Sequence, residues 1–298
     1  MAAVRHVRAN GIDIAYETFG DEGNPAMLLV MGLGTQMLGW PDELCERLAG
    51  NGFHVIRFDN RDIGLSRHLD GEAVPDIVRV ALRRQKPPYG IEDMASDAIA
   101  LIEVLGLGPA HVVGASMGGF IAQTMALKRP DLLRSLTLIM TSTGSRRVGH
   151  PSPRVIATVL RRKPAVGRSA AIAASLAMFR LIGSPAYPMD EESHNELAGR
   201  SYDRAYDPAG SGRQLAATVA QADRTRALST IAVPTLVMHG LSDRLVNASG
   251  GLALARIIPG ATFIGFHGMG HDFPRALWPD FVREITANAL RADPSPPS

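Results

Sequence analysis

Ser116 lies at the centre of the segment GASMG, residues 114–118, in which a glycine stands two positions to either side of the serine. This G-x-S-x-G spacing is typical of a sharp turn from a strand into a helix, because only very small side chains fit beside the strained serine backbone. The neighbouring sequence agrees, since residues 111–114 form a short β-rich run and residues 117–128 have helical character. A serine at such a turn can attack a carbonyl carbon once a base removes its proton.

His271 is the best placed of nine histidines to supply this base. It follows the last predicted strand, residues 262–266, within the glycine-rich segment GMGHD. Loops at the carboxyl ends of strands carry the ligand sites of open α/β sheets. His267, at the end of the same strand, is the second choice, and His239, which closes the preceding strand, is expected to be structural.

Asp243 is the predicted acid that orients the imidazole and stabilises its protonated form. It lies on the loop after the predicted strand of residues 235–238, and the chain order serine, aspartate, histidine is one that accompanies this type of turn. An acid after the strand of residues 136–140 is the other known placement, but the segment MTST at its end holds no carboxylate. Asp272 is a minor alternative, because adjacent residues rarely face each other.

Two backbone amides are expected to stabilise the negative charge that develops on a carbonyl oxygen under attack. The turn at Ser116 aims the Met117 amide at this oxyanion. The second donor is predicted to be the Leu33 amide in the segment MGLG, residues 31–34, where glycines let the backbone approach a substrate.

The remaining sequence alternates apolar runs with helical patterns, which predicts an α/β fold with a mostly parallel sheet covered by helices. Asn10-Gly11 between two β-rich runs indicates a tight hairpin, so the sheet is expected to begin antiparallel. The eight predicted strands comprise residues 4–9, 12–19, 27–31, 54–58, 111–114, 136–140, 235–238 and 262–266.

The alternation stops between residues 146 and 226, which we interpret as a helical cap inserted into a core of residues 1–145 and 227–298. Met178 and Phe179, in the predicted helix of residues 170–181, are candidate substrate-binding residues, although they could instead pack the cap onto the core. Arginine-rich patches in the cap are expected to be solvated. Residues 292–298, with the sequence ADPSPPS, are predicted to be a disordered tail.

The composition of the 298-residue chain excludes several classes of function. It has 31 basic and 29 acidic residues, so its net charge of +2 favours neither nucleic acid nor an anionic membrane as partner. Its single cysteine, Cys45, cannot form an internal disulfide and is expected to be a buried apolar residue. No apolar run approaches the roughly 20 residues that span a bilayer. A soluble, cytoplasmic protein is therefore expected.

The sequence resembles the α/β-hydrolase superfamily, and its nearest likeness is to carboxylesterases of the aclacinomycin methylesterase type. The likeness is densest in residues 27–67 and recurs in residues 111–119, 233–243 and 268–271. It implies an eight-stranded sheet with helices on both faces and a cap that shapes the substrate pocket. Many relatives have His-Gly where this chain has Met31-Gly32, but a backbone donor does not depend on that side chain. Other matches lie in a structural loop after the fourth strand: Asp59, Arg61, Gly64 and Ser66.

These features predict a serine carboxylesterase that acts on a small-molecule ester through an acyl-enzyme, without a metal or organic cofactor. The same catalytic residues would serve a lactonase, a carbon–carbon bond hydrolase or a cofactor-free perhydrolase, because specificity resides in the pocket. Dehalogenase and epoxide-hydrolase chemistry is disfavoured, since it would need an aspartate in place of Ser116. A non-catalytic binding protein on this scaffold is the alternative from another class. The oligomeric state is not predicted.

Overall fold

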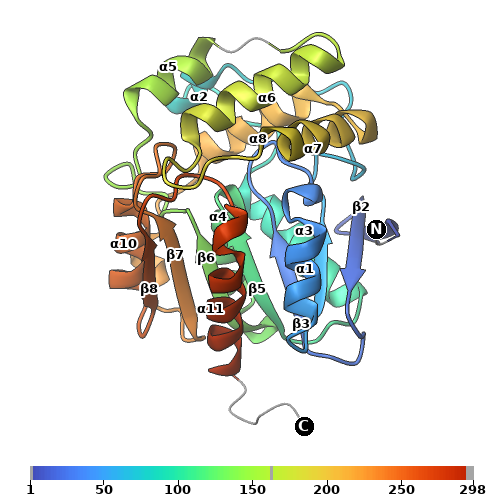
Figure 1. The fold of residues 1–298 in the computed structure, drawn as a ribbon, viewed down its shortest axis with the longest axis vertical. Coiled ribbons are helices and arrows are strands. Elements are labelled where there is room, and N and C mark those ends of the chain that lie inside the picture. The colour runs from blue at the N-terminus through green and yellow to red at the C-terminus, as the bar shows by residue number, and fades with distance from the viewer. Residues whose placement is uncertain (1–2, 162–163, 293–298) are drawn as a thin grey trace.

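The computed structural model describes residues 3–161 and 164–292 of the chain. Within these ranges it contains an eight-stranded sheet in the order β1-β2-β4-β3-β5-β6-β7-β8 (Figure 1). β2 pairs antiparallel with β1 and β4, and every other neighbouring pair is parallel. The predicted mostly parallel α/β sheet is therefore confirmed. Its strands are β1 (Arg5–Ala9), β2 (Ile12–Phe19), β3 (Ala26–Val30), β4 (His54–Phe58), β5 (Ala110–Ala115), β6 (Leu133–Ile139), β7 (Thr235–Gly240) and β8 (Thr262–Phe266).

The antiparallel start of the sheet results from the turn at Asn10 and Gly11. Both residues have positive φ, 49° and 76°, the conformation that a two-residue hairpin requires and that asparagine and glycine adopt most readily. The register pairs Ala9 with Ile12, so the strands meet directly at this turn. The predicted hairpin is confirmed.

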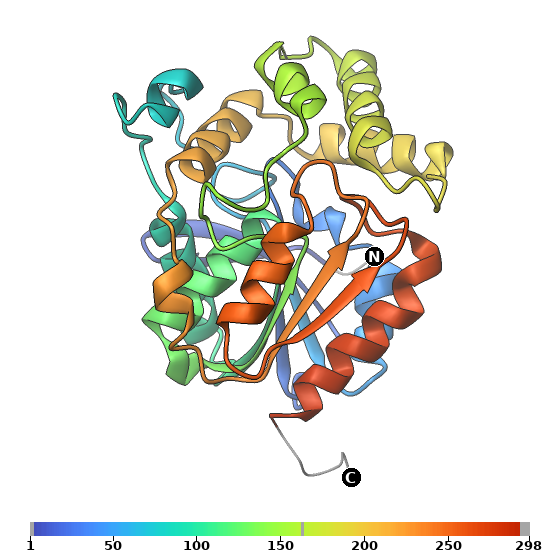
Figure 2. The same cartoon turned by 90° about the vertical axis from the view of Figure 1, so that its left-hand side faces the viewer.

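Apolar cores lie on both faces of the sheet. On one face the strands pack against α3 (Ile91–Val104), α4 (Met117–Lys128) and α10 (Ser249–Ile257). On the other they pack against α1 (Asp42–Ala49) and α11 (Trp278–Leu290), and Figure 2 shows the sheet between α10 and α11. Because helices cover both faces, β3, β4, β5 and β7 are buried along their whole length, as expected of inner parallel strands.

A layer of helices between β6 and β7 lies beyond one end of the sheet, above the strands in both views (Figures 1 and 2). It consists of α5 (Pro153–Arg161), α6 (Arg168–Ile182), α7 (Glu191–Arg204) and α8 (Pro208–Ala220). We call these four helices and their connections the cap. The limits of 146 and 226 for this insertion stay a prediction.

Local differences from the predicted elements have physical causes. Three short or small-residue helices outside the four helices of the cap were not predicted: α2 (Ile77–Ala81), α9 (Thr225–Leu228) and α10. α2 is too brief to show helical periodicity, and it begins because the Asp76 side chain accepts hydrogen bonds from the Val78 and Arg79 amides. β6 begins at Leu133, three residues before the predicted strand.

Other features of the chain concern its environment. Cys45 is buried, as predicted, and burial raises the pKa of its thiol to about 12. Among the described residues, no helix is both long and apolar enough to cross a membrane. The predicted disordered tail lies outside the described residues except for Ala292.

Candidate active site

Ser116 occupies the turn between β5 and α4 with φ of 54° and ψ of −118°, a backbone conformation that residues other than glycine rarely adopt. Glycines at both flanking positions make this turn possible. A Cβ atom on Gly114 would lie 2.3 Å from the Gly118 carbonyl oxygen, and one on Gly118 would lie 2.0 Å from the Val30 carbonyl oxygen. The sequence spacing therefore has a steric cause, since any side chain at either glycine would displace the backbone around the serine.

Three side chains from distant parts of the chain meet at this turn. The Ser116 hydroxyl lies 3.0 Å from His271 Nε2, and His271 Nδ1 lies 2.7 Å from Asp243 Oδ2. Both partners of the serine follow neighbouring parallel strands, Asp243 after β7 and His271 after β8. Parallel strands end at the same edge of the sheet, which explains how Ser116 and His271, 155 positions apart, come together.

The Asp243 carboxylate is held in place from its other side. Its Oδ1 accepts hydrogen bonds of 2.8 Å from the amides of Leu245 and Val246, while Oδ2 faces the His271 ring. The ionised Asp243 carboxylate can only accept a hydrogen bond, which favours the tautomer with the proton on His271 Nδ1 and leaves Nε2 able to accept the Ser116 hydroxyl proton. The Asp243 side chain is fully buried and that of His271 is 8% exposed, so little water competes for these bonds.

The alternative residues make no hydrogen bond to Ser116 in the described structure. His239 is buried with its Nε2 3.6 Å from Asp243 Oδ2, but this nitrogen lies closer, at 2.8 Å, to the Val246 carbonyl oxygen, and burial lowers the pKa of the ring. His267 is exposed at the end of β8. The Asp272 carboxylate accepts a hydrogen bond from the Ser184 hydroxyl rather than from the His271 ring, and burial raises its pKa.

The loop after β3 lies directly against the serine. A Cβ atom on Gly32 would come within 3.1 Å of Ser116 Cβ, so the backbone of this loop packs directly against the serine. Within the described residues, the Leu33 amide makes no hydrogen bond, whereas the next amide, Gly34 N–H, donates to the Gln214 side chain at 2.8 Å. Met117 is the first residue of α4, where a helix leaves its amide without an internal partner.

Met31, where the chain departs from many relatives, is held through its backbone. The Met31 carbonyl oxygen accepts from Asn60 Nδ2 at 3.0 Å, and its side chain is buried in the core. Asn60 belongs to the loop after β4, in which Asp59 accepts hydrogen bonds from the Met37 and Leu65 amides at 2.7 and 2.9 Å. This loop therefore supports the backbone around the serine.

The cap contacts the site through residues that sequence patterns did not reveal. The backbone amide of His271 donates to the Ile182 carbonyl oxygen at 2.8 Å, and Gly270 N–H donates to the Ser184 hydroxyl at 2.9 Å. Gln214 of α8 reaches the loop after β3. No local signal in the sequence marks these residues, because each bonds to a partner at least 86 positions away.

The two candidate substrate-binding residues lie in α6, the cap helix that ends beside His271. Met178 lines a groove of about 540 Å³ between α5 and α6, together with Arg154, Ala157 and Ala174. The Phe179 ring packs on the His194 ring of α7, with centroids 4.6 Å apart. Among the described residues, neither Met178 nor Phe179 makes a hydrogen bond or ring contact with Ser116, His271 or Asp243. Their part in substrate binding stays a prediction.

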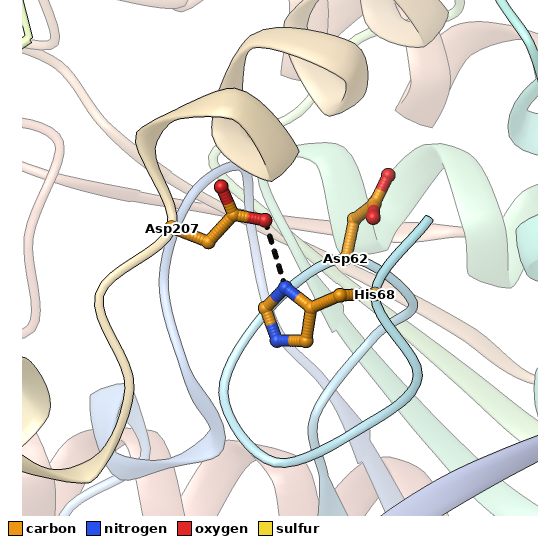
Figure 3. A group of neighbouring side chains, drawn as sticks. All are labelled: Asp62, His68 and Asp207. Carbon is orange, nitrogen blue, oxygen red and sulfur yellow. Dashed lines mark hydrogen bonds and ion pairs between the residues drawn. The ribbon is translucent and has the colours of Figure 1, made fainter. Parts of the chain in front are cut away.

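Asp62, His68 and Asp207 form a second group of titratable side chains, and their donor atoms lie within 4.8 Å of one another (Figure 3). Arg213 gives the Asp62 carboxylate two hydrogen bonds, of 2.8 and 2.9 Å. Burial opposes ionisation of Asp62, but these bonds and one from the Leu69 amide lower its pKa. A metal ion would have to displace the guanidinium, so we interpret the group as an ion-pair network.

His68 joins this network to the cap. Its Nδ1 lies 2.8 Å from Asp207 Oδ2 and its Nε2 lies 2.9 Å from the Gly64 carbonyl oxygen, so both ring nitrogens face acceptors. Only the protonated ring can donate to both. Although burial opposes protonation, these hydrogen bonds raise the pKa of His68.

Comparisons with known proteins agree with this architecture. A family model for the alpha/beta hydrolase fold matches residues 25–274. The rhodomycin D methylesterase DauP of Streptomyces sp. is 27% identical over 97% of this chain and 98% of its own length. The 3-oxoadipate enol-lactonase 2 of Acinetobacter baylyi is 25% identical over 85% of each chain. In fold, the crystal structure of the enol-lactonase from Burkholderia xenovorans is similar with a TM-score of 0.74, at 22% identity, over 95% of this chain and 99% of that one.

Proposed function

The chain belongs to the α/β-hydrolase fold family, as its sequence resemblance predicted, and from this premise we propose that it is a carboxylic ester hydrolase. The observation that carries the proposal is the pair of hydrogen bonds from Ser116 to His271 and from His271 to Asp243, of 3.0 and 2.7 Å. Relatives with this fold include a methylesterase and an enol-lactonase, which both act on ester linkages. A small-molecule ester is the proposed substrate class.

In the first half-reaction the Ser116 oxygen attacks the ester carbonyl carbon while His271 Nε2 accepts the hydroxyl proton. Asp243 holds Nδ1–H and stabilises the imidazolium that forms. The tetrahedral intermediate collapses, the alcohol leaves with the proton from His271, and an acyl group stays on Ser116. Water then attacks this acyl-enzyme by the same route and releases the acid.

The oxyanion of both tetrahedral intermediates is proposed to lie between the Leu33 and Met117 amides. Two features support this assignment: the Leu33 amide makes no hydrogen bond among the described residues, and Met117 begins a helix. The positive end of the α4 dipole adds to the attraction for negative charge. Backbone donors need no reorganisation when charge develops, which is why they are effective in the transition state.

The test is hydrolysis of p-nitrophenyl esters from acetate to decanoate, with methyl esters and lactones as further substrates. Ser116→Ala should lower kcat/KM by at least about 10³-fold, because it removes the attacking oxygen. Mass spectrometry of the quenched reaction should show an acyl adduct on wild type and none on the variant. A preference for lactones over open esters would shift the proposal to a lactonase.

A matched control is available in the core. Ser135 is buried and its hydroxyl lies 2.9 Å from His111 Nδ1, which makes a second serine–histidine pair away from the proposed site. Ser135→Ala should leave kcat per folded molecule unchanged. Folded wild type with no turnover on any ester or lactone would contradict the proposal and favour a binding protein.

A further inference from the structure

We propose that Gln214 of the cap positions the loop that supplies the Leu33 amide to the oxyanion, an inference that rests on the proposed ester hydrolysis. Gln214 lies in α8 and is completely buried. Its Oε1 accepts the Gly34 amide at 2.8 Å, and its Nε2 donates to the Arg61 carbonyl oxygen at 2.8 Å. One side-chain amide thus joins the loops that follow β3 and β4.

The chemistry of a glutamine fits both partners. One neighbour is a donor and the other an acceptor, and a carboxamide is the neutral group that offers one of each at this separation. Both partners are backbone atoms, so their identities do not depend on the side chains of Gly34 and Arg61. A buried amide with both bonds made has a single favoured orientation.

These bonds act on the peptide unit next to the proposed oxyanion donor. The unit between Leu33 and Gly34 has its N–H bound by Gln214 and its carbonyl oxygen bound by the Thr35 hydroxyl at 3.2 Å. With this plane fixed on both edges, the rotation that would turn the Leu33 amide away from Ser116 is restrained. Gln214 binds the Gly34 amide, whereas the Leu33 amide makes no hydrogen bond in the described part of the chain and stays available to a substrate.

The position of Gln214 is itself fixed by its neighbour in α8. Arg213 makes its two hydrogen bonds to the buried Asp62 carboxylate, which anchors this turn of the helix to the loop after β4. We therefore regard Gln214 as a positioning residue rather than a catalytic one, because it acts through the loop and has no bond to Ser116 or His271 in the described structure.

Two substitutions at this site separate hydrogen bonding from packing. Gln214→Met keeps the length of the side chain and removes both bonds, so we expect kcat to fall by about 10-fold with KM changed less than about twofold, since the oxyanion forms only after binding. Gln214→Glu can make both bonds when its carboxyl is protonated. Its kcat should approach that of wild type at low pH and decline as the carboxyl ionises, giving an alkaline loss that Gln214→Met lacks.

Amide hydrogen exchange provides a readout that does not depend on turnover. Peptides covering residues 32–36 should exchange faster in Gln214→Met than in wild type, because the Gly34 amide loses its acceptor. Thr218→Val is the matched control: Thr218 lies one turn further along α8, and among the described residues its hydroxyl bonds to the Gln214 carbonyl oxygen alone. It should change neither exchange in this loop nor kcat.

The outcomes distinguish the two proposals. Unchanged exchange in Gln214→Met would show that Gln214 does not hold the loop. Faster exchange with unchanged kcat would show that the loop does not serve the oxyanion, and either result overturns the inference. Wild type without ester turnover would instead overturn the proposed function and the oxyanion role with it, while exchange would still decide whether Gln214 fixes this backbone.

Discussion

The contacts that bury the strands of the sheet differ in kind from those that bury the helices of the cap. Every residue of β3 and β4 is buried, and most of them are apolar. In the described part of the cap, by contrast, α5 buries only Val155 and α6 only Ile182. The residues that α8 buries include Arg213 and Gln214, which are charged and polar.

Buried ion pairs take the place of apolar area where the cap meets the core. Arg213 pairs with Asp62, and Arg204 of α7 pairs with Asp59 at 2.6 Å, with both carboxylates fully buried. Apolar burial stabilises in proportion to area and tolerates small shifts, whereas a buried charge pair is favourable only in one geometry. We infer that the core supplies most of the stability and that the cap contacts mainly supply alignment.

The largest expected effect on stability is in the sheet. Leu28→Ala in β3 removes a completely buried side chain from the core and should lower the free energy of unfolding by about 2–5 kcal/mol. Chemical denaturation should still show one transition, at a lower denaturant concentration. A loss below about 1 kcal/mol would contradict the assignment of stability to the core.

A second effect should be confined to the cap. Arg213→Met leaves the Asp62 carboxylate buried without its cation, which should lower the free energy of opening α8 by about 3 kcal/mol. Hydrogen exchange should increase in α7 and α8 and stay unchanged in β3 and β5.

The control for this substitution is Arg168→Met, also in the cap. Arg168 pairs with Asp203 at 2.7 Å, but both side chains are more than half exposed, so solvent screens the pair and its loss should change exchange in the cap far less. Equal effects of the two substitutions would contradict the distinction between buried and exposed ion pairs. Faster exchange throughout the sheet in Arg213→Met would contradict the distinction between the cap and the core.

The smallest expected effect is a pH dependence of the contact between the start of α8 and His68. The pKa of His68 is raised in the folded protein, so its contribution to stability is complete below the unfolded pKa and is lost as the pH rises through the folded pKa. Asp207, Asp62 and Arg213 are the charged groups around it. The protection of amides in the first turn of α8, measured as the exchange rate relative to the intrinsic rate at each pH, should therefore fall at alkaline pH.

His68→Gln provides the comparison, because glutamine does not titrate. The variant should lack this alkaline loss of protection. The same pH profile in both proteins would assign the titration to another group.

The sequence predicted features that depend on local spacing. Glycines around Ser116, the Asn10-Gly11 turn and the apolar runs of the strands carry their own steric or hydrophobic cause, and the structure contains the corresponding turns and strands. Asp243 and His271 could be proposed because strand order places the ends of β7 and β8 together.

The contacts of the cap could not be predicted in this way. Asp62 and Arg213 lie 151 positions apart, and nothing near either residue in the sequence indicates its partner. The same is true of Gln214, whose helical surroundings are compatible with an exposed or a buried glutamine. Such pairs are fixed by how whole helices dock, which residue spacing does not encode.

The bond between the His271 amide and the Ile182 carbonyl oxygen constrains how this protein can diverge. Both atoms belong to the backbone, so substitution of either residue leaves the hydrogen bond intact. Close approach at Gly270, where a Cβ would lie 2.4 Å from the Gly183 carbonyl carbon, limits that position to glycine. Insertions or deletions between α6 and α7 would move the loop that carries His271. Homologues should therefore vary in the composition of the α6–α7 connection while conserving the length of that connection.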